Sequence, residues 1–210
     1  NLDGQFDDDI LYGHGGNDFL FGGAGDDTIS GGDGIDRIFG DAGDNFLLGD
    51  LGNDKIFGGN DADTIYGGQG NDLIKGGNGS NTLYGDEGDD VIRGGNGTDV
   101  VSGGTGKDII LGGAGDDHLS GNEGVDRIYG DGGSNTIDGG ADNDKLFGGS
   151  DNDIIYGGTG SDLIRGGDGD NHLYGGDGVD IIRGGTGTDI IEGGLGDDNI
   201  LSFEGDDQID

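Results

Sequence analysis

A nonapeptide repeat runs through the whole chain and constrains its fold more than any other feature. The frame is clear in residues 157–165, which read Gly-Gly-Thr-Gly-Ser-Asp-Leu-Ile-Arg. The same frame gives 23 consecutive copies from residue 4 to residue 210, without insertion or deletion. Nonapeptide periods are typical of parallel β-solenoids, in which each repeat contacts only its neighbours. The repeat therefore predicts one elongated solenoid instead of several globular domains.

Four positions of the repeat carry most of the pattern. Position 1 is Gly in every copy but the last, which has Ser202, and position 8 is always Ile, Leu or Val. Position 4 is Gly, and its exceptions are Asp7, Asp61, Asp142 and Asp151. Position 6 is Asp, and its exceptions are Asn45, Asn81, Asn135 and Asn171. Because Gly, Asp and Asn tolerate turn conformations, positions 1–6 are predicted to form a turn and positions 7–9 a three-residue strand with one buried side chain.

Two copies, or 18 residues, make one coil of strand, turn, strand and turn. The predicted fold is all-β: a right-handed parallel β-roll, or β-solenoid, with two short-stranded parallel sheets. Odd-numbered copies would build one sheet and even-numbered copies the other. At about 4.8 Å per coil the rod would be about 55 Å long. We expect residues 1–210 to form a single continuous roll and, because the chain starts within a repeat, to be a fragment of a longer protein.

Composition shows that the chain needs cations to fold. Hydrophobic residues make up 29% of the sequence and the formal net charge is −36, a balance that by itself is typical of disordered chains. Nine basic residues against 45 acidic ones exclude nucleic acid and anionic membrane surfaces as expected partners. No apolar run is long enough for a membrane span, and the absence of Cys removes disulfides. The natural partner of such a chain is a positive ion.

The position-6 carboxylates indicate which ion. They recur every 18 residues along each edge of the predicted roll, so pairs such as Asp54 and Asp72 would stack about 5 Å apart. A hard cation between them would remove the repulsion. Ca²⁺ suits such turns because it accepts roughly six to eight oxygen ligands in loose geometry, whereas Mg²⁺ requires a tighter octahedron and Zn²⁺ prefers Cys or His. About 18 divalent ions would cancel the charge of −36.

The motif Gly-Gly-x-Gly-x-Asp-x-(Ile/Leu)-x resembles the repeat of the RTX, or haemolysin-type calcium-binding, family, and the resemblance covers essentially all 210 residues. It implies Ca²⁺ held between successive turns by position-6 carboxylates and turn carbonyls. It also implies type I secretion from a Gram-negative bacterium, with folding on contact with external calcium, and a secreted, extracellular or cell-surface location. Carried over position by position, the metal ligands would be Asp9, Asp18, Asp27, Asp36, Asp54, Asp63, Asp72, Asp90, Asp99, Asp108, Asp117, Asp126, Asp144, Asp153, Asp162, Asp180, Asp189, Asp198 and Asp207.

The four asparagines at position 6 depart from this pattern on one edge only, since all of them fall in odd copies. Asn keeps an oxygen but loses the charge, so it is expected to lower the local affinity for the ion. Asp61 stands one coil after Asn45, and Asp151 one coil after Asn135. We hypothesise that these extra carboxylates compensate for the lost charge.

Outward-facing residues distinguish the two faces of the rod. Eight of the nine basic residues lie at positions 7 and 9 of even copies beside aromatic or aliphatic side chains, whereas odd copies show mainly Thr, Tyr and other polar residues. The pattern recurs at an offset of 90 residues, or ten copies. The even-copy face either balances the charge of the acidic edges or contacts another rod or partner. Its contact residues would be Arg37, Phe39, Lys55, Phe57, Arg127, Tyr129, Lys145 and Phe147.

No enzyme active site is predicted. The Gly-x-Gly-x-x-Gly matches lack a βαβ unit, and His118, Ser120 and Asp117 would not converge on a pocket. The favoured function is a calcium-dependent structural protein, a segment of an extracellular fibre, surface layer or large adhesin. The alternative is the C-terminal secretion and folding module of a type I-secreted enzyme or toxin, such as a lipase, protease, epimerase or haemolysin.

Overall fold

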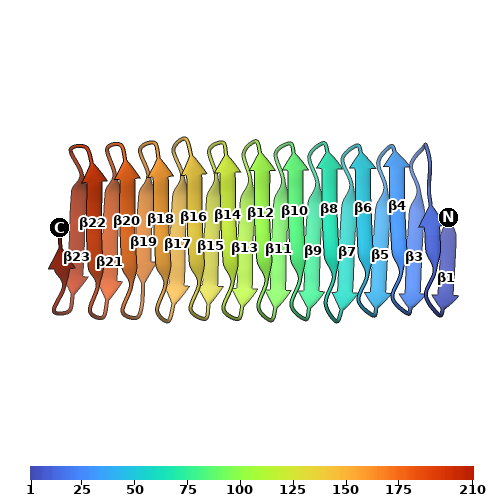
Figure 1. The fold of residues 1–210 in the computed structure, drawn as a ribbon, viewed down its shortest axis with the longest axis horizontal. Coiled ribbons are helices and arrows are strands. Elements are labelled where there is room, and N and C mark those ends of the chain that lie inside the picture. The colour runs from blue at the N-terminus through green and yellow to red at the C-terminus, as the bar shows by residue number, and fades with distance from the viewer.

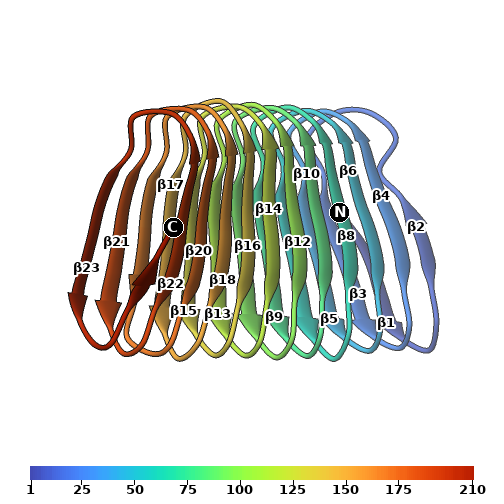
Figure 2. The ribbon, with the colours of Figure 1, turned by 60° about the vertical axis from the view of Figure 1, so that its left-hand side comes forward.

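The computed structural model describes residues 1–210 as one rod of stacked coils (Figure 1). It contains 24 β-strands and no helix, and so none that could cross a membrane. The two termini lie at opposite ends of the rod, and turns follow one another along its two long edges (Figures 1 and 2). The prediction of an all-β parallel solenoid is confirmed.

The strands form two parallel sheets of 12 strands each. The first sheet contains the odd-numbered strands: β1 (Leu2–Phe6), β3 (Phe19–Ala24), β5 (Arg37–Ala42), β7 (Lys55–Asn60), β9 (Leu73–Asn78), β11 (Val91–Asn96), β13 (Ile109–Ala114), β15 (Arg127–Gly132), β17 (Lys145–Ser150), β19 (Leu163–Gly167), β21 (Ile181–Thr186) and β23 (Asn199–Glu204). The second sheet contains the even-numbered strands: β2 (Ile10–Tyr12), β4 (Thr28–Asp33), β6 (Phe46–Leu51), β8 (Thr64–Gln69), β10 (Thr82–Glu87), β12 (Val100–Thr105), β14 (His118–Glu123), β16 (Thr136–Ala141), β18 (Ile154–Thr159), β20 (His172–Asp177), β22 (Ile190–Leu195) and β24 (Gln208–Ile209).

The register between neighbouring strands is constant. Leu83 of β10 pairs with Ile65 of β8 on one side and with Val101 of β12 on the other, an offset of 18 residues each way. The same offset holds in every strand pair of the first sheet, for example between Ile92 and Ile110. Even copies therefore build the first sheet and odd copies the second, as the sequence predicts.

The strands are longer than the three residues predicted from the repeat, and that prediction was wrong. Most span six residues, positions 7–9 of one copy and positions 1–3 of the next, as β10 does. In β10 both Leu83 and Gly85 point into the rod, at positions 8 and 1. Position 1 resembles a turn residue because it is Gly. Without a side chain, however, it fits inside the narrow rod and continues the ladder of backbone hydrogen bonds.

The hydrophobic core is a single column of position-8 side chains. It contains 21 buried Ile, Leu and Val residues, from Leu11 at one end to Ile191 at the other. Because each coil contributes only two of these side chains, each one packs mainly against the coil above and the coil below. The core is therefore thin, and the stability of each coil depends strongly on its neighbours.

This core predicts the effect of truncating one of its members. Leu146→Ala should lower the free energy of unfolding by about 2–5 kcal/mol, because Leu146 is fully buried and the rod cannot collapse around the cavity. Leu51→Ala is the matched control, since Leu51 is 45% exposed and should cost well under that. Denaturant unfolding at a fixed millimolar calcium concentration measures both. Equal losses of stability would contradict the single-column core.

Candidate metal centres

The position-6 side chains line the two long edges of the rod, each at the turn that leads into a strand. We call the edge before the first sheet the all-Asp edge, with Asp18, Asp36, Asp54, Asp72, Asp90, Asp108, Asp126, Asp144, Asp162, Asp180 and Asp198. The mixed edge, before the second sheet, has Asp9, Asp27, Asn45, Asp63, Asn81, Asp99, Asp117, Asn135, Asp153, Asn171, Asp189 and Asp207. Two such side chains on successive coils form one rung.

From the second coil onward, one oxygen of each position-6 carboxylate accepts a hydrogen bond from the preceding coil. The backbone N–H of Asp126 donates to Oδ1 of Asp144 at 2.7 Å, and the N–H of Asp144 donates to Oδ1 of Asp162 at 2.8 Å. The same bond recurs at every rung of both edges, for example from Asp99 to Asp117 at 2.9 Å. A continuous ladder of hydrogen bonds therefore runs along each edge, and these bonds are charge-assisted wherever the acceptor is an ionised aspartate.

The other oxygen has no donor. Oδ2 is buried and without a hydrogen-bond partner in 16 of the 19 aspartates predicted as ligands: Asp9, Asp27, Asp36, Asp54, Asp63, Asp72, Asp90, Asp99, Asp108, Asp117, Asp126, Asp144, Asp153, Asp162, Asp180 and Asp189. Asp18, Asp198 and Asp207 are more exposed and lie near the ends of the rod. Because a buried anionic oxygen without a partner is strongly unfavourable, a row of them requires a positive charge or a proton.

Backbone oxygens gather around the unpaired Oδ2 atoms. A Cβ added to Gly139, at position 1, would lie 2.6 Å from Oδ2 of Asp144 and 2.6 Å from the carbonyl oxygen of Gly157 on the next coil. The space that Gly leaves empty is thus bordered by a carboxylate oxygen and a carbonyl oxygen. This explains why position 1 is Gly even though its φ is not left-handed.

The asparagines reveal two further oxygens at this place. A Cβ added to Gly40 would lie 2.6 Å from Nδ2 of Asn45, so this nitrogen occupies the place that Oδ2 has elsewhere. Nδ2 of Asn45 donates to the carbonyl oxygen of Gly43 at 2.9 Å and to Oδ1 of Asp63 at 3.0 Å. Since the register is constant, Oδ2 of an aspartate faces the corresponding two oxygens with no hydrogen between them. Each rung that begins with an aspartate therefore has four oxygens around one small space. Two come from the first coil, Oδ2 and the position-4 carbonyl, and two from the next coil, Oδ1 and the position-1 carbonyl.

Burial changes the acidity of these carboxyl groups. Desolvation raises the pKa of Asp90, Asp108 and Asp144 from 3.8 to about 7, against the lowering effect of the backbone hydrogen bond from the preceding coil. Negative charges of neighbouring aspartates raise it further. By the same causes the pKa is raised to about 6 in a second group: Asp54, Asp63, Asp72, Asp117, Asp153 and Asp162. In the absence of a cation, the folded rod thus favours protonation of its edges.

The donor set fits a calcium ion. No group of three or more His, Cys, Asp or Glu side chains converges on one point, so each rung offers at most two carboxylates, with backbone carbonyls as the remaining oxygens. Oxygen ligands drawn largely from carbonyls and held in flexible turns suit Ca²⁺ better than Zn²⁺. The ion would neutralise Oδ2 and join two successive coils.

Asp61 and Asp151, the two position-4 carboxylates expected to compensate for asparagines, lie on the turns of the mixed edge. Oδ2 of Asp61 accepts a hydrogen bond from the backbone N–H of Gly43 at 3.3 Å, and Oδ2 of Asp151 accepts one from Gly133, also at 3.3 Å. Each of these acceptors therefore touches the turn of an asparagine copy one coil earlier. That they compensate for the charge of the asparagine remains a prediction.

The outer face of the first sheet, which we call the basic face, carries stacked rings and unpaired cations. The ring centroids of Phe21 and Phe39 lie 5.0 Å apart, and those of Phe39 and Phe57 lie 4.9 Å apart. Nζ of Lys75 lies 5.4 Å from the ring centroid of Phe57. The one salt bridge in the structure joins the N-terminus to Asp18, so none of the nine Lys and Arg residues forms one. Direct pairing with the acidic edges therefore does not account for this face.

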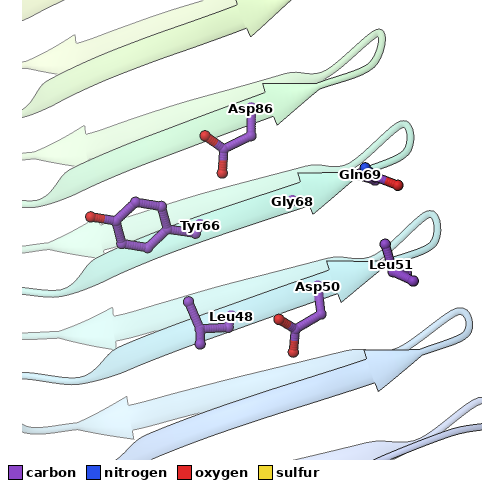
Figure 3. A pocket seen from close by; sticks show the side chains of 7 residues that line it. All are labelled: Leu48, Asp50, Leu51, Tyr66, Gly68, Gln69 and Asp86. Carbon is purple, nitrogen blue, oxygen red and sulfur yellow. The ribbon is translucent and has the colours of Figure 1, made fainter.

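A shallow groove of about 340 Å³ lies on the outer face of the second sheet (Figure 3). Gly68 forms its floor between Asp50 and Asp86, with Tyr66 beside it. These two carboxylates are two coils, or about 10 Å, apart, which is too far for one ion to bind both. This groove was not predicted from the repeat; it arises where Gly68 at position 2 lies between two aspartates at the same position on neighbouring strands.

The His118, Ser120 and Asp117 group does not form a triad. Oγ of Ser120 donates to Oδ1 of Asn122 at 3.2 Å, while Asp117 is buried in the mixed edge and accepts the backbone N–H of Asp99. His118 is exposed on the outer face of β14. The hydroxyl, the imidazole and the carboxylate thus have separate surroundings and do not contact one another as a catalytic triad would.

Comparison with protein families gives one match. The profile of the RTX calcium-binding nonapeptide repeat, a unit of four copies, matches overlapping windows that together cover residues 1 to 210. The windows are 1–29, 30–65, 39–74, 66–101, 75–110, 93–128, 102–137, 120–155, 129–164, 156–191 and 183–210. No individual curated protein matches the chain.

The raised pKa values predict how the metal-free chain responds to pH. The pKa is 3.8 in the unfolded chain and about 6 to 7 in the folded rod, so the folded state binds more protons in between. The resulting stability is present below about pH 4 and is lost as pH rises through 6 to 7. Circular dichroism in calcium-depleted buffer should show β-structure increasing as pH falls from 7.5 to 4. A signal that rises with pH would contradict the protonation of the edges.

Proposed function

Because the chain belongs to the RTX family of calcium-binding nonapeptide repeats, we propose that it is a calcium-dependent extracellular structural rod, a segment of a surface fibre, surface layer or large adhesin. In this proposal the position-6 aspartates are the ligands, and each ion lies between two successive turns. The row of buried Oδ2 atoms without hydrogen-bond partners carries the proposal. These atoms support a rod that folds fully only when a cation neutralises each buried, unpaired Oδ2.

The calcium concentration of a compartment would then determine whether the chain is folded there. Extracellular calcium modules bind in a range of roughly 10⁻⁴ to 10⁻³ M, far above the calcium level of a cytosol. Since the unfolded chain has no preformed site, the free energy of ion binding is also free energy of folding. The chain would remain unfolded inside the cell, pass through a type I secretion channel in that form, and fold outside.

Removal of calcium tests this proposal. At pH 7.5 the chain in calcium-depleted buffer should show the circular dichroism of a disordered chain, and millimolar calcium should restore the β-signal reversibly, because each ion removes the repulsion at one rung. Equimolar magnesium is the control and should restore much less, since Mg²⁺ demands a tighter octahedron. A full β-signal without any divalent ion would overturn the proposal.

The basic face supports a structural role. Its eight Lys and Arg side chains form no salt bridge within the rod, whereas the outer face of the second sheet carries half-buried and exposed acidic residues and no Lys or Arg. These acidic residues are Asp50, Asp86, Asp138 and Glu192. The basic face of one rod therefore complements the second-sheet face of another. We propose lateral contact between rods through these two faces, with the stacked aromatic rings as the apolar part of the contact.

Charge reversal on the basic face tests the contact between rods. At millimolar calcium the unmodified chain should gain mass above that of a single rod, as measured by small-angle X-ray scattering across protein concentrations. The double variant Lys55→Glu with Lys145→Glu should remain monomeric, because it removes the charge complementarity. Lys107→Glu is the matched control, since Lys107 is the one basic residue that lies in a turn, and it should behave as the unmodified chain. A monomeric unmodified rod at all concentrations would contradict self-assembly and favour a secretion and folding module.

A further inference from the structure

The four asparagines of the mixed edge form closed hydrogen-bond bridges between coils. In the rung of Asn45 and Asp63, both the backbone N–H and Nδ2 of Asn45 donate to Oδ1 of Asp63, each at 3.0 Å. Nδ2 also donates to the carbonyl oxygen of Gly43 at 2.9 Å. The two oxygens that an Oδ2 atom would repel thus each receive a hydrogen from the amide.

The bridge recurs at the other asparagines. Nδ2 of Asn81 donates to the carbonyl oxygen of Gly79 at 3.3 Å and to Oδ1 of Asp99 at 3.0 Å. Nδ2 of Asn171 donates at 3.1 Å both to the carbonyl oxygen of Gly169 and to Oδ1 of Asp189. Nδ2 of Asn135 donates to the carbonyl oxygen of Gly133 at 2.9 Å within its own coil, and a hydrogen bond from the same side chain acts to lower the pKa of Asp153 on the next coil. No side-chain atom of any of the four asparagines is buried without a partner.

Each asparagine acts on one of its two rungs only. Toward the preceding coil its Oδ1 does what an aspartate does: the backbone N–H of Asp27 donates to Oδ1 of Asn45 at 3.0 Å. The rung of Asp27 and Asn45 keeps the unpaired Oδ2 of Asp27 and so keeps the need for a cation. Only the rung toward the following coil is closed by the amide.

We infer that each asparagine replaces one calcium ion with an amide bridge, so that four of the 11 rungs of the mixed edge need no ion. The all-Asp edge would take an ion at each of its ten rungs, and the mixed edge at the remaining seven. This inference rests on the proposed role of the position-6 aspartates as calcium ligands. It differs from a simple loss of affinity, because the amide supplies the bond between coils that the ion supplies elsewhere.

The bridges would fix part of the rod before calcium arrives. They lie in two pairs, Asn45 with Asn81 and Asn135 with Asn171, and the second pair repeats the first at an offset of 90 residues. Within each pair the two closed rungs are separated by one rung that still needs an ion, so each closed rung joins two coils into a short stack along one edge without metal. Because ordering of the first coils is the costly step in a solenoid, such stacks would lower the calcium concentration at which the rod forms.

The test compares substitutions at equivalent positions in the full chain. Changing all four asparagines to aspartate should raise the number of calcium ions bound at saturation by four and move the midpoint of calcium-induced folding to higher calcium. Asp108→Asn, in the middle of the all-Asp edge, should bind one ion fewer and fold at lower calcium. Asp108→Ala is the control: because it removes both oxygens, one from each of two rungs, it should bind at least one ion fewer, and it should fold at higher calcium since no amide takes the place of the ion. Equilibrium dialysis with elemental analysis counts the ions, and circular dichroism gives the midpoints.

Two results would overturn the inference while leaving calcium-dependent folding intact. One is an unchanged ion count in the fourfold variant. The other is the same folding midpoint for Asp108→Asn and Asp108→Ala, which would show that the amide does no more than remove a charge. The unmodified chain tests the proposed function separately, because a failure to bind calcium or to fold with it would refute the ligand assignment itself.

Discussion

Repulsion between buried carboxylates stacked one coil apart is the constraint on which the rest of the structure depends. The 18-residue register puts every position-6 side chain directly above its equivalent, and the turn buries it, so that one oxygen bonds the neighbouring coil while the other is left without a donor. The core cannot override this, since it is one column of aliphatic side chains. The rod therefore requires its edges to be neutralised, and the edges couple the fold to the ions around it.

Much of this architecture could be predicted from the sequence because the repeat is strict. The invariant aliphatic residue at position 8 identifies the core column, and two copies per coil give the alternation of the sheets, which the strand pairing bears out. The strand boundaries could not be predicted from turn propensity. Gly139 and its equivalents look like turn residues, yet they lie inside the rod. Glycine is required there because a Cβ would come too close to the carboxylate and to the facing carbonyl.

The detail of the candidate metal centres was only partly predictable. Spacing alone shows that Asp54 and Asp72 stack, but not that their two oxygens differ, because the difference arises from which backbone N–H the carboxylate meets in three dimensions. The role of Asn45 was underestimated for the same reason. A sequence shows the loss of a charge, whereas the structure shows a nitrogen placed between two acceptors.

The assignment of alternate copies to opposite sheets restricts how such a chain can change length. Gain or loss of one nonapeptide would keep the turn and the core in frame but would transfer every later copy to the other sheet, exchanging the basic face and the outer face of the second sheet from that point on. Gain or loss of 18 residues preserves both faces. The 90-residue offset equals ten copies, an even number, so the outward residues that recur at this offset do so on the same side of the rod. Lengthening by whole coils is thus the path that keeps surface chemistry continuous along the axis.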